Sequence, residues 1–193
     1  LLQSQFLHLQ LEALTFIRKN LIANIWYSCK NNKLRIIVSR TSEEFLRRLF
    51  ELEIPEINDG TVMIYSVARD AGNRSKVAVY SENPQVDPIG ACVGENSSRI
   101  REVVRSLNGE KIDLYRWSDD IAELVANALQ PTNVVAVINI DTKTKTSLAI
   151  VPDNQLSLAI GKNGQNVRLA VQSCDWKIDI KPVSVAKNQG YEW

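Results

Sequence analysis

The stretch QLSLAIGKNGQNVR, residues 155–168, decides the fold. Apolar residues on both sides of the two glycines predict two short helices joined by a tight turn. Gly161 and Gly164 have no side chains, so the backbone can turn sharply there and a ligand can come close. The helix that begins after the turn exposes unpaired backbone N–H groups with a partial positive charge, to which Lys162 and Arg168 add full charges. The turn is therefore predicted to bind phosphate oxygens.

The chain contains this pattern twice. Each copy has two strands, a short helix, a turn, a second helix and a closing strand. Gly94 and Gly161 lie 67 residues apart, and the tripeptide Lys-Ile-Asp recurs at residues 111–113 and 177–179, which are 66 residues apart. The difference of one residue indicates a deletion in a loop. The expected strands span 61–68, 75–81 and 111–114 in the first copy and 134–140, 146–151 and 177–180 in the second, which opens with a helix over 119–129.

The chain before the repeat predicts a hairpin and a helix. Residues 21–28 and 33–40 are β-branched and apolar, with a polar turn between them. Ser42 followed by two glutamates is typical of a helix start, and Pro55 sets the end of that helix. Residues 1–15 fit neither the helical nor the strand period.

A G-x-x-G turn between two helices is the nucleic-acid clamp of the KH module, in which the turn holds the backbone of four nucleotides. One such turn alone is weak evidence, because helix-turn-helix contacts also use glycine for packing. Here the turn follows two strands, precedes a third and recurs in a repeat, which favours the KH interpretation. The fold class is therefore predicted to be α+β, with two three-stranded sheets that are each packed by helices on one face. Each copy has about 70 residues, small for an independent core, so the copies are expected to pack together.

Longer strings carry a family resemblance. They are RRLFELEIPEI (47–57), VDPIGACVG (86–94), LNGEKID (107–113), QLSLAIGKNGQN (155–166) and WKIDI (176–180). These strings resemble the tandem KH portion of the bacterial NusA family, and the likeness extends over residues 42–181. The resemblance implies type II KH domains. In that family an OB-fold barrel precedes the KH pair, and residues 16–41 resemble its last two strands.

The resemblance also implies a domain organisation and a function. The expected parts are a partial OB-fold barrel remnant at 1–41, a linking helix and first KH domain at 42–117, a second KH domain at 118–184 and a tail at 185–193. The implied function is binding of single-stranded nascent RNA beside RNA polymerase and other elongation factors. Such binding tunes transcription elongation, pausing, termination and antitermination without a catalytic step. A cytoplasmic monomer is expected.

The expected RNA contacts come from the two turns. They are Gly161, Lys162, Asn163, Gly164, Gln165, Asn166 and Arg168 in the second copy and Gly94, Glu95, Asn96, Ser97, Ser98, Arg99 and Arg101 in the first. In the first turn Ser97 stands where the second glycine belongs, and Glu95 puts a negative charge where phosphate approaches. The second turn is therefore expected to dominate phosphate binding. For Arg99 and Arg101 a solvated helix face remains an equal alternative.

Composition limits the other functions. The net charge of +1 does not by itself indicate a nucleic-acid partner, so the electrostatic attraction must be local. One histidine and three widely spaced cysteines predict no metal site, no histidine-based catalytic dyad and no disulfide framework, and no cofactor is expected. No apolar run reaches the length of a membrane span, and neither a P-loop nor a nucleophile elbow is present. Trp117 and Trp176 are expected to pack in the core.

Two other classes of function stay open at this stage. One is an enzyme that uses KH modules as accessories. The other is a KH-fold protein-interaction scaffold with weak or lost RNA binding, which the altered first turn allows.

Overall fold

The computed structural model describes the backbone of residues 24–30 and 33–193, and the side chains from residue 39 onward. The chain divides into two compact units, residues 1–49 and 50–193, and the second unit contains both copies of the repeat. The expectation for residues 1–15 lies outside the described residues.

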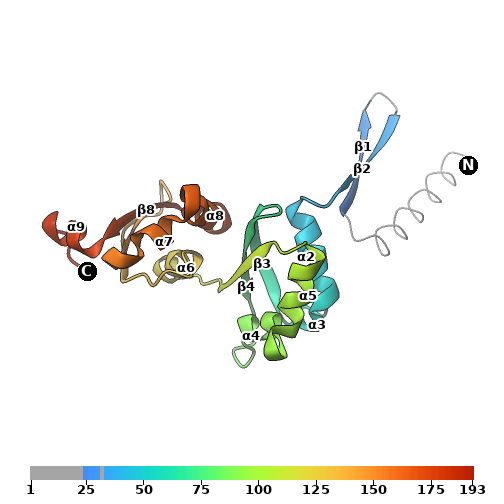
Figure 1. The fold of residues 1–193 in the computed structure, drawn as a ribbon, viewed down its shortest axis with the longest axis horizontal. Coiled ribbons are helices and arrows are strands. Elements are labelled where there is room, and N and C mark those ends of the chain that lie inside the picture. The colour runs from blue at the N-terminus through green and yellow to red at the C-terminus, as the bar shows by residue number, and fades with distance from the viewer. Residues whose placement is uncertain (1–23, 31–32) are drawn as a thin grey trace, which may run out of the picture. The chain divides into compact units, whose positions relative to one another are not determined.

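A hairpin forms the described start of the chain. Strands β1 (Asn24–Lys30) and β2 (Lys33–Ser39) pair antiparallel, with Asn24 opposite Ser39 (Figure 1). The two strands of the sequence prediction are therefore present where the chain is described. The turn between them lies outside the described residues. Assignment of this hairpin to an OB-fold barrel stays a prediction, because a two-stranded sheet alone does not define a barrel.

Two helices follow the hairpin. Helix α2 spans Glu43–Glu53, and the backbone N–H of Phe45 donates to the Ser42 hydroxyl oxygen over 3.2 Å, as expected of a helix cap. Helix α3 (Pro55–Asn58) was not predicted. Pro55 occupies its first turn, where backbone N–H groups have no partner within the helix. Proline lacks an N–H group, so no hydrogen bond is lost there. Helix α2 ends at Glu53, before Pro55 as predicted, and the proline begins a second, short helix.

The first copy forms a mixed sheet of order β3-β4-β5. Strands β3 (Met63–Asp70) and β4 (Arg74–Tyr80) pair antiparallel, and β5 (Lys111–Arg116) pairs parallel to β4. A parallel pair needs a crossover connection, which helices α4 (Pro88–Val93) and α5 (Ser98–Ser106) supply.

The second copy repeats this topology after helix α6 (Ile121–Ala128). Its sheet has the order β6-β7-β8, with strands at Ala136–Asp141, Thr146–Val151 and Lys177–Pro182. Helices α7 (Leu156–Ile160) and α8 (Gln165–Cys174) form the crossover, and helix α9 (Val183–Asn188) follows. The α+β tandem KH prediction is confirmed. The sequence did not predict helix α9. The helix includes residue 185, where the tail was expected to begin, and its Ala186 is fully buried.

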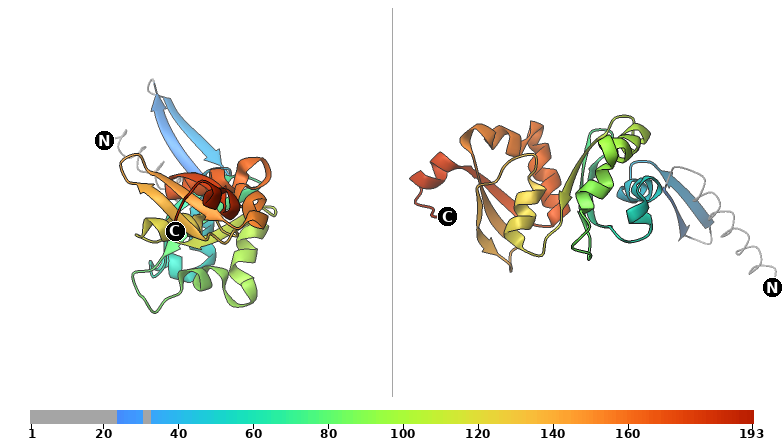
Figure 2. Two further views of the ribbon diagram at one scale, coloured as in Figure 1. Left: turned by 90° about the vertical axis from the view of Figure 1, so that its left-hand side faces the viewer. Right: turned by 90° about the horizontal axis from the view of Figure 1, so that it is seen from below.

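The two copies share a hydrophobic core. Figure 2 shows the ribbons of the two copies next to each other. Ala78 and Tyr115 of the first sheet pack in one cluster with residues of α6, α8, β7 and β8. The Tyr115 hydroxyl lies 2.7 Å from that of Ser173 in α8, and Ser66 lies 3.0 Å from the same hydroxyl. The expectation that the copies pack together is thus met. Helix α8 of the second copy also packs on β3 and β4 of the first sheet. Five consecutive residues of β4 are buried, so both faces of this strand are covered, and the expectation of helices on one face only is wrong for the first sheet.

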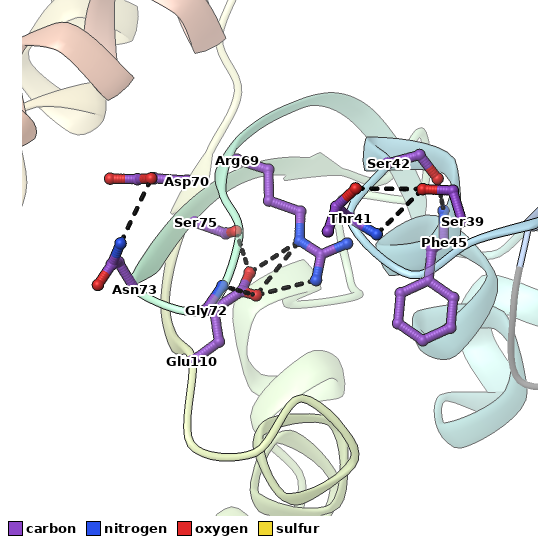
Figure 3. Close-up of polar contacts among 10 residues, drawn as sticks. All are labelled: Ser39, Thr41, Ser42, Phe45, Arg69, Asp70, Gly72, Asn73, Ser75 and Glu110. Atoms are coloured by element: carbon purple, nitrogen blue, oxygen red, sulfur yellow. Dashed lines mark hydrogen bonds and ion pairs between the residues drawn. The ribbon is translucent and has the colours of Figure 1, made fainter.

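A buried ion pair anchors the hairpin of the first sheet (Figure 3). Glu110, which is 1% exposed, accepts hydrogen bonds from Arg69 Nε and Nη2, both over 2.9 Å. The Ser75 hydroxyl over 2.5 Å and the Gly72 N–H over 2.9 Å also donate to it. Burial acts to raise the pKa of Glu110, but these hydrogen bonds outweigh it and leave the pKa below its usual value. The carboxylate is therefore charged and fully bonded within the sheet.

Candidate nucleic-acid interface

The two turns have nearly the same backbone conformation. Gly94 has φ 71° and ψ 173°, and Gly161 has φ 76° and ψ 170°. Asn96 and Asn163 are both in the left-handed region, with φ 50° and 52°. The sequences of the two turns differ, but the first turn keeps the shape of a G-x-x-G turn.

Ser97 keeps the left-handed conformation that Gly164 has in the second turn. Its φ is 58° and its ψ is 27°, compared with 72° and 14° for Gly164. The Ser97 N–H donates to the Gly94 carbonyl over 3.1 Å, and the Gly164 N–H donates to the Gly161 carbonyl over the same distance. A serine in this region costs roughly 1 kcal/mol relative to glycine, so the first turn carries a strain that the second does not.

Close helix packing explains the first glycine of each turn. A Cβ atom at Gly161 would lie 2.7 Å from the backbone nitrogen of Asn166, and one at Gly94 would lie 2.7 Å from Cγ of Arg99. In both copies the residue five positions after the glycine therefore touches it. The conformation of both glycines is also one that only glycine adopts readily.

Arg99 and Asn166 support the turns through hydrogen bonds to the helix that precedes each turn. Arg99 Nη1 donates to Glu56 Oε2 over 2.6 Å and to the Ala91 carbonyl over 2.7 Å. The hydrogen bond from Arg99 lowers the pKa of Glu56. These contacts tie α5 to α4, so Arg99 acts as a brace and not simply as a solvated face.

Asn166 is the counterpart of Arg99 in the second copy. It is 4% exposed, and its Nδ2 donates to the carbonyls of Leu129 over 3.1 Å and Ala159 over 3.0 Å. A side chain held in this way is not available to RNA. The Asn166 side chain therefore supports the turn. For the predicted RNA contact, Asn166 has its backbone N–H in the first turn of α8.

The remaining predicted residues of the second turn lie at the surface. Lys162 and Asn163 are exposed, and Lys162 makes no ion pair with any described residue. Leu158 and Ile160 on the preceding helix are 46% and 40% exposed. Exposed apolar side chains beside a cationic turn suit a nucleotide, because its base stacks on apolar surface while its phosphate faces the charge.

The first turn is exposed too, but with different chemistry. Glu95, Asn96, Ser98 and Arg101 face solvent. The Arg101 guanidinium donates to the Asn96 carbonyl and so closes over the turn. The first turn thus presents one anion and one cation that is bonded to the turn's own backbone.

A residue that the sequence prediction missed, Asp70, lies against the second turn. This residue ends strand β3 of the first copy, and its Oδ2 accepts from Gln165 Nε2 over 2.8 Å and from Arg168 Nη2 over 3.1 Å. The hydrogen bond from Gln165 is the main cause of a lowered pKa at Asp70. Only the tertiary fold brings Asp70 to residues more than 90 positions later, so no local pattern could have indicated it.

The other candidates are structural. Trp176 is buried in the shared core, as expected, and Trp117 packs against that core under the ring of Tyr65, 4.7 Å away. Burial raises the pKa of Cys92 to about 12 and that of Cys174 to about 11. Among the described residues, no group of three or more histidine, cysteine or acidic side chains could hold a metal ion. None of the helices in the described part of the chain is long and apolar enough to cross a membrane.

Family models match both copies. Residues 40–117 match the NusA-like first KH domain, and residues 121–188 match the NusA-like second KH domain. The solved structure of APE1850 covers 67% of this chain and 96% of its own, with a TM-score of 0.50 and 21% identity, and supports the fold alone.

Curated relatives are similar over most of the chain. The transcription termination/antitermination protein NusA of Halalkalibacterium halodurans is 59% identical over 156 residues, which make up 81% of this chain and 41% of that protein. The NusA protein of Bacillus subtilis is 54% identical over 81% of this chain and 42% of its own length. That of Mycobacterium tuberculosis is 51% identical over 76% of this chain and 42% of its own. The chain thus spans less than half the length of these relatives.

Proposed function

Because this chain belongs to the NusA family through its two KH domains, we propose that it binds single-stranded nascent RNA and helps to regulate transcription elongation, pausing, termination and antitermination. The binding involves no catalytic step. RNA polymerase and other elongation factors are its proposed partners, and it acts in the cytoplasm as a monomer.

The second turn is the observation that carries this proposal. Both of its glycines adopt positive φ angles, Lys162 is exposed between them, and α8 begins directly after them. Phosphate oxygens can therefore approach the unpaired N–H groups of the helix with a cation beside them. The apolar side chains of Leu158 and Ile160 offer surface for the attached bases.

A protein-interaction scaffold is the competing function. It would keep the fold and show no salt-dependent affinity for RNA. Single-strand binding through phosphates weakens with salt, by about 0.7 in the log–log slope for each neutralised phosphate. A binding isotherm at several salt concentrations therefore separates the two functions, because a flat or absent isotherm would favour the scaffold.

The direct test places anions in the second turn. Changing Lys162 and Asn163 to Asp should weaken RNA binding by about 2 kcal/mol or more, because two carboxylates then face the same phosphates. Asn96→Asp in the first turn is matched by Asn163→Asp alone in the second, since each adds one negative charge at the same place in its turn. Asn96→Asp should cost clearly less than Asn163→Asp, because Glu95 already repels phosphate there. Circular dichroism should show native folds, since these side chains are exposed. Equal losses from both turns, or a larger loss from the first, would contradict the dominance of the second turn.

A further inference from the structure

A cavity joins the first copy to the second turn. It has a volume of about 270 Å³ and is lined by Asp70 and Asn73 of the first copy and by Lys162, Asn163, Gln165 and Arg168 of the second. The hairpin between β3 and β4 supplies one wall, and the G-x-x-G turn with the start of α8 supplies the other. The site at the second turn is therefore built from both copies.

The two walls carry opposite charges. Lys162 is exposed on the wall of the turn, whereas Asp70 places a carboxylate on the wall of the hairpin. A phosphate fits beside Lys162 and is repelled by Asp70. A group that donates hydrogen bonds fits beside Asp70. A nucleotide carries both kinds of group, since its phosphate is an anion and the edge of its base can donate N–H groups.

One oxygen of Asp70 is available for such a donor. Within the described part of the chain its Oδ2 accepts from Gln165 and Arg168, whereas its Oδ1 accepts from the Asn73 amide alone, at 3.5 Å. That distance is at the limit of a hydrogen bond. Gln165 and Arg168 fix the orientation of the carboxylate, so Oδ1 is held ready to accept from a ligand.

We propose that Asp70 is a specificity-determining residue, which accepts a hydrogen bond from the exocyclic amino group of the base whose phosphate lies on the second turn. The proposal rests on RNA binding as the function of this turn. Adenine, cytosine and guanine each carry an exocyclic amino group, and uracil carries only carbonyl oxygens beside its ring N–H. A carboxylate repels those carbonyls, so uracil is disfavoured at this one position.

Adenosine replaced by purine riboside tests the proposal, because the change removes the 6-amino group and nothing else. A short adenine- and cytosine-rich single-stranded RNA is used in which each adenosine is replaced in turn. In the unmodified protein one position should lose affinity about fivefold to tenfold, as expected for the loss of one hydrogen bond. In Asp70→Asn the donors Gln165 and Arg168 should hold the amide oxygen, so that the NH2 group faces the base and cannot accept from its amino group. The same replacement should then change the affinity of this variant less than about twofold. Uracil at this position should bind better to the variant, since the new amide can donate to a carbonyl.

The control is Asp175→Asn, which makes the same charge change at the opposite end of α8. Asp175 is exposed, pairs with Lys145, and has a left-handed backbone that asparagine tolerates. This variant should keep the base dependence of the unmodified protein. Thermal unfolding of each variant identifies any loss of fold.

Three results would overturn the proposal. Asp70→Asn could weaken all RNAs equally, which would make Asp70 a structural link between the copies. It could strengthen all RNAs equally, which would make the carboxylate only a barrier to phosphate. The unmodified protein could show no position that depends on the amino group. In each case the variant with Lys162→Asp and Asn163→Asp would still lose affinity if the turn binds RNA. Failure of the Asp70 proposal can therefore be distinguished from failure of the proposed RNA binding.

Discussion

In the first KH copy a partly buried arginine, Arg99, braces the turn through an ion pair with Glu56. In the second copy the buried amide of Asn166 does so by donating to two carbonyls. The leading glycines of the two turns nevertheless differ by only 5° in φ and 3° in ψ. Different side chains thus hold one backbone shape, which indicates that the shape of the turn is what the KH module requires.

The residues that precede the two closing strands also differ between the copies. Glu110 precedes β5 of the first copy and is bonded to Arg69, Ser75 and Gly72, whereas Trp176 precedes β8 of the second and is packed in the shared core. A buried ion pair is sensitive to pH and to loss of one partner. A buried tryptophan is sensitive only to loss of volume. The two copies, which form one compact unit, should therefore lose stability through different kinds of substitution.

The largest expected effect comes from breaking these anchors. Glu110→Ala should lower the free energy of unfolding by about 3–5 kcal/mol, because it removes the buried carboxylate that accepts hydrogen bonds from Arg69, Ser75 and Gly72. Trp176→Ala should cost a similar amount, about 3–5 kcal/mol, through the cavity that it leaves. Urea unfolding measures both. A cost below about 1 kcal/mol for Glu110→Ala would mean that water or another group replaces the carboxylate.

The leading glycines provide the next comparison. Gly161→Ala should destabilise the protein by about 3 kcal/mol, since the new methyl group meets the backbone nitrogen of Asn166 in a conformation that only glycine favours. Gly94→Ala should cost less, about 2 kcal/mol, because the atoms that it meets belong to the flexible side chain of Arg99. Urea unfolding of the two variants gives the order. A larger cost at Gly94 would show that the Arg99 brace is the more rigid of the two.

Acid should affect the two anchors differently. The pKa of Glu110 is lowered in the folded protein from the usual 4.5, so its contribution is present above pH 4.5 and is lost as the pH falls through the folded pKa. The stability difference between the unmodified protein and Glu110→Gln should therefore shrink as the pH falls below 4.5. The deficit of Trp176→Ala should stay constant over the same range. Unfolding at a series of pH values checks both, and a constant deficit for Glu110→Gln would place its pKa outside this window.

The sequence predicted what local chemistry determines. Hydrophobic periodicity and the repeat placed the strands and crossover helices to within a few residues, and the glycines located both turns. Contacts between distant segments were not readable in this way. Arg99 and Asn166 look like surface helix residues in sequence, but packing of α5 on α4 and of α8 on α6 turns them inward. Asp70 is the last residue of a strand with no distinctive sequence feature. Only the packing of the second copy brings it to Arg168.

The last comparison concerns the side chains of the turns themselves. Ser97→Gly removes the strain of a left-handed serine but adds the larger backbone entropy of glycine in the unfolded chain. The first effect is about 1 kcal/mol or slightly more, and the second is about 0.4–1 kcal/mol. The net gain in stability should therefore be small, about 0.5 kcal/mol.

Glu95→Lys tests charge without changing the shape of the turn. It replaces an exposed anion by a cation at the position that Lys162 holds in the second turn. If the first turn fails to bind phosphate only because of its charge, this variant should gain RNA affinity and steepen the salt dependence by about 0.7. Ser97→Gly alone should change RNA affinity little, because the two backbones already match. A gain from Ser97→Gly equal to that from Glu95→Lys would show that the serine side chain blocks the approach of the RNA backbone. In that case the two copies differ in the steric access of the turn as well as in its charge.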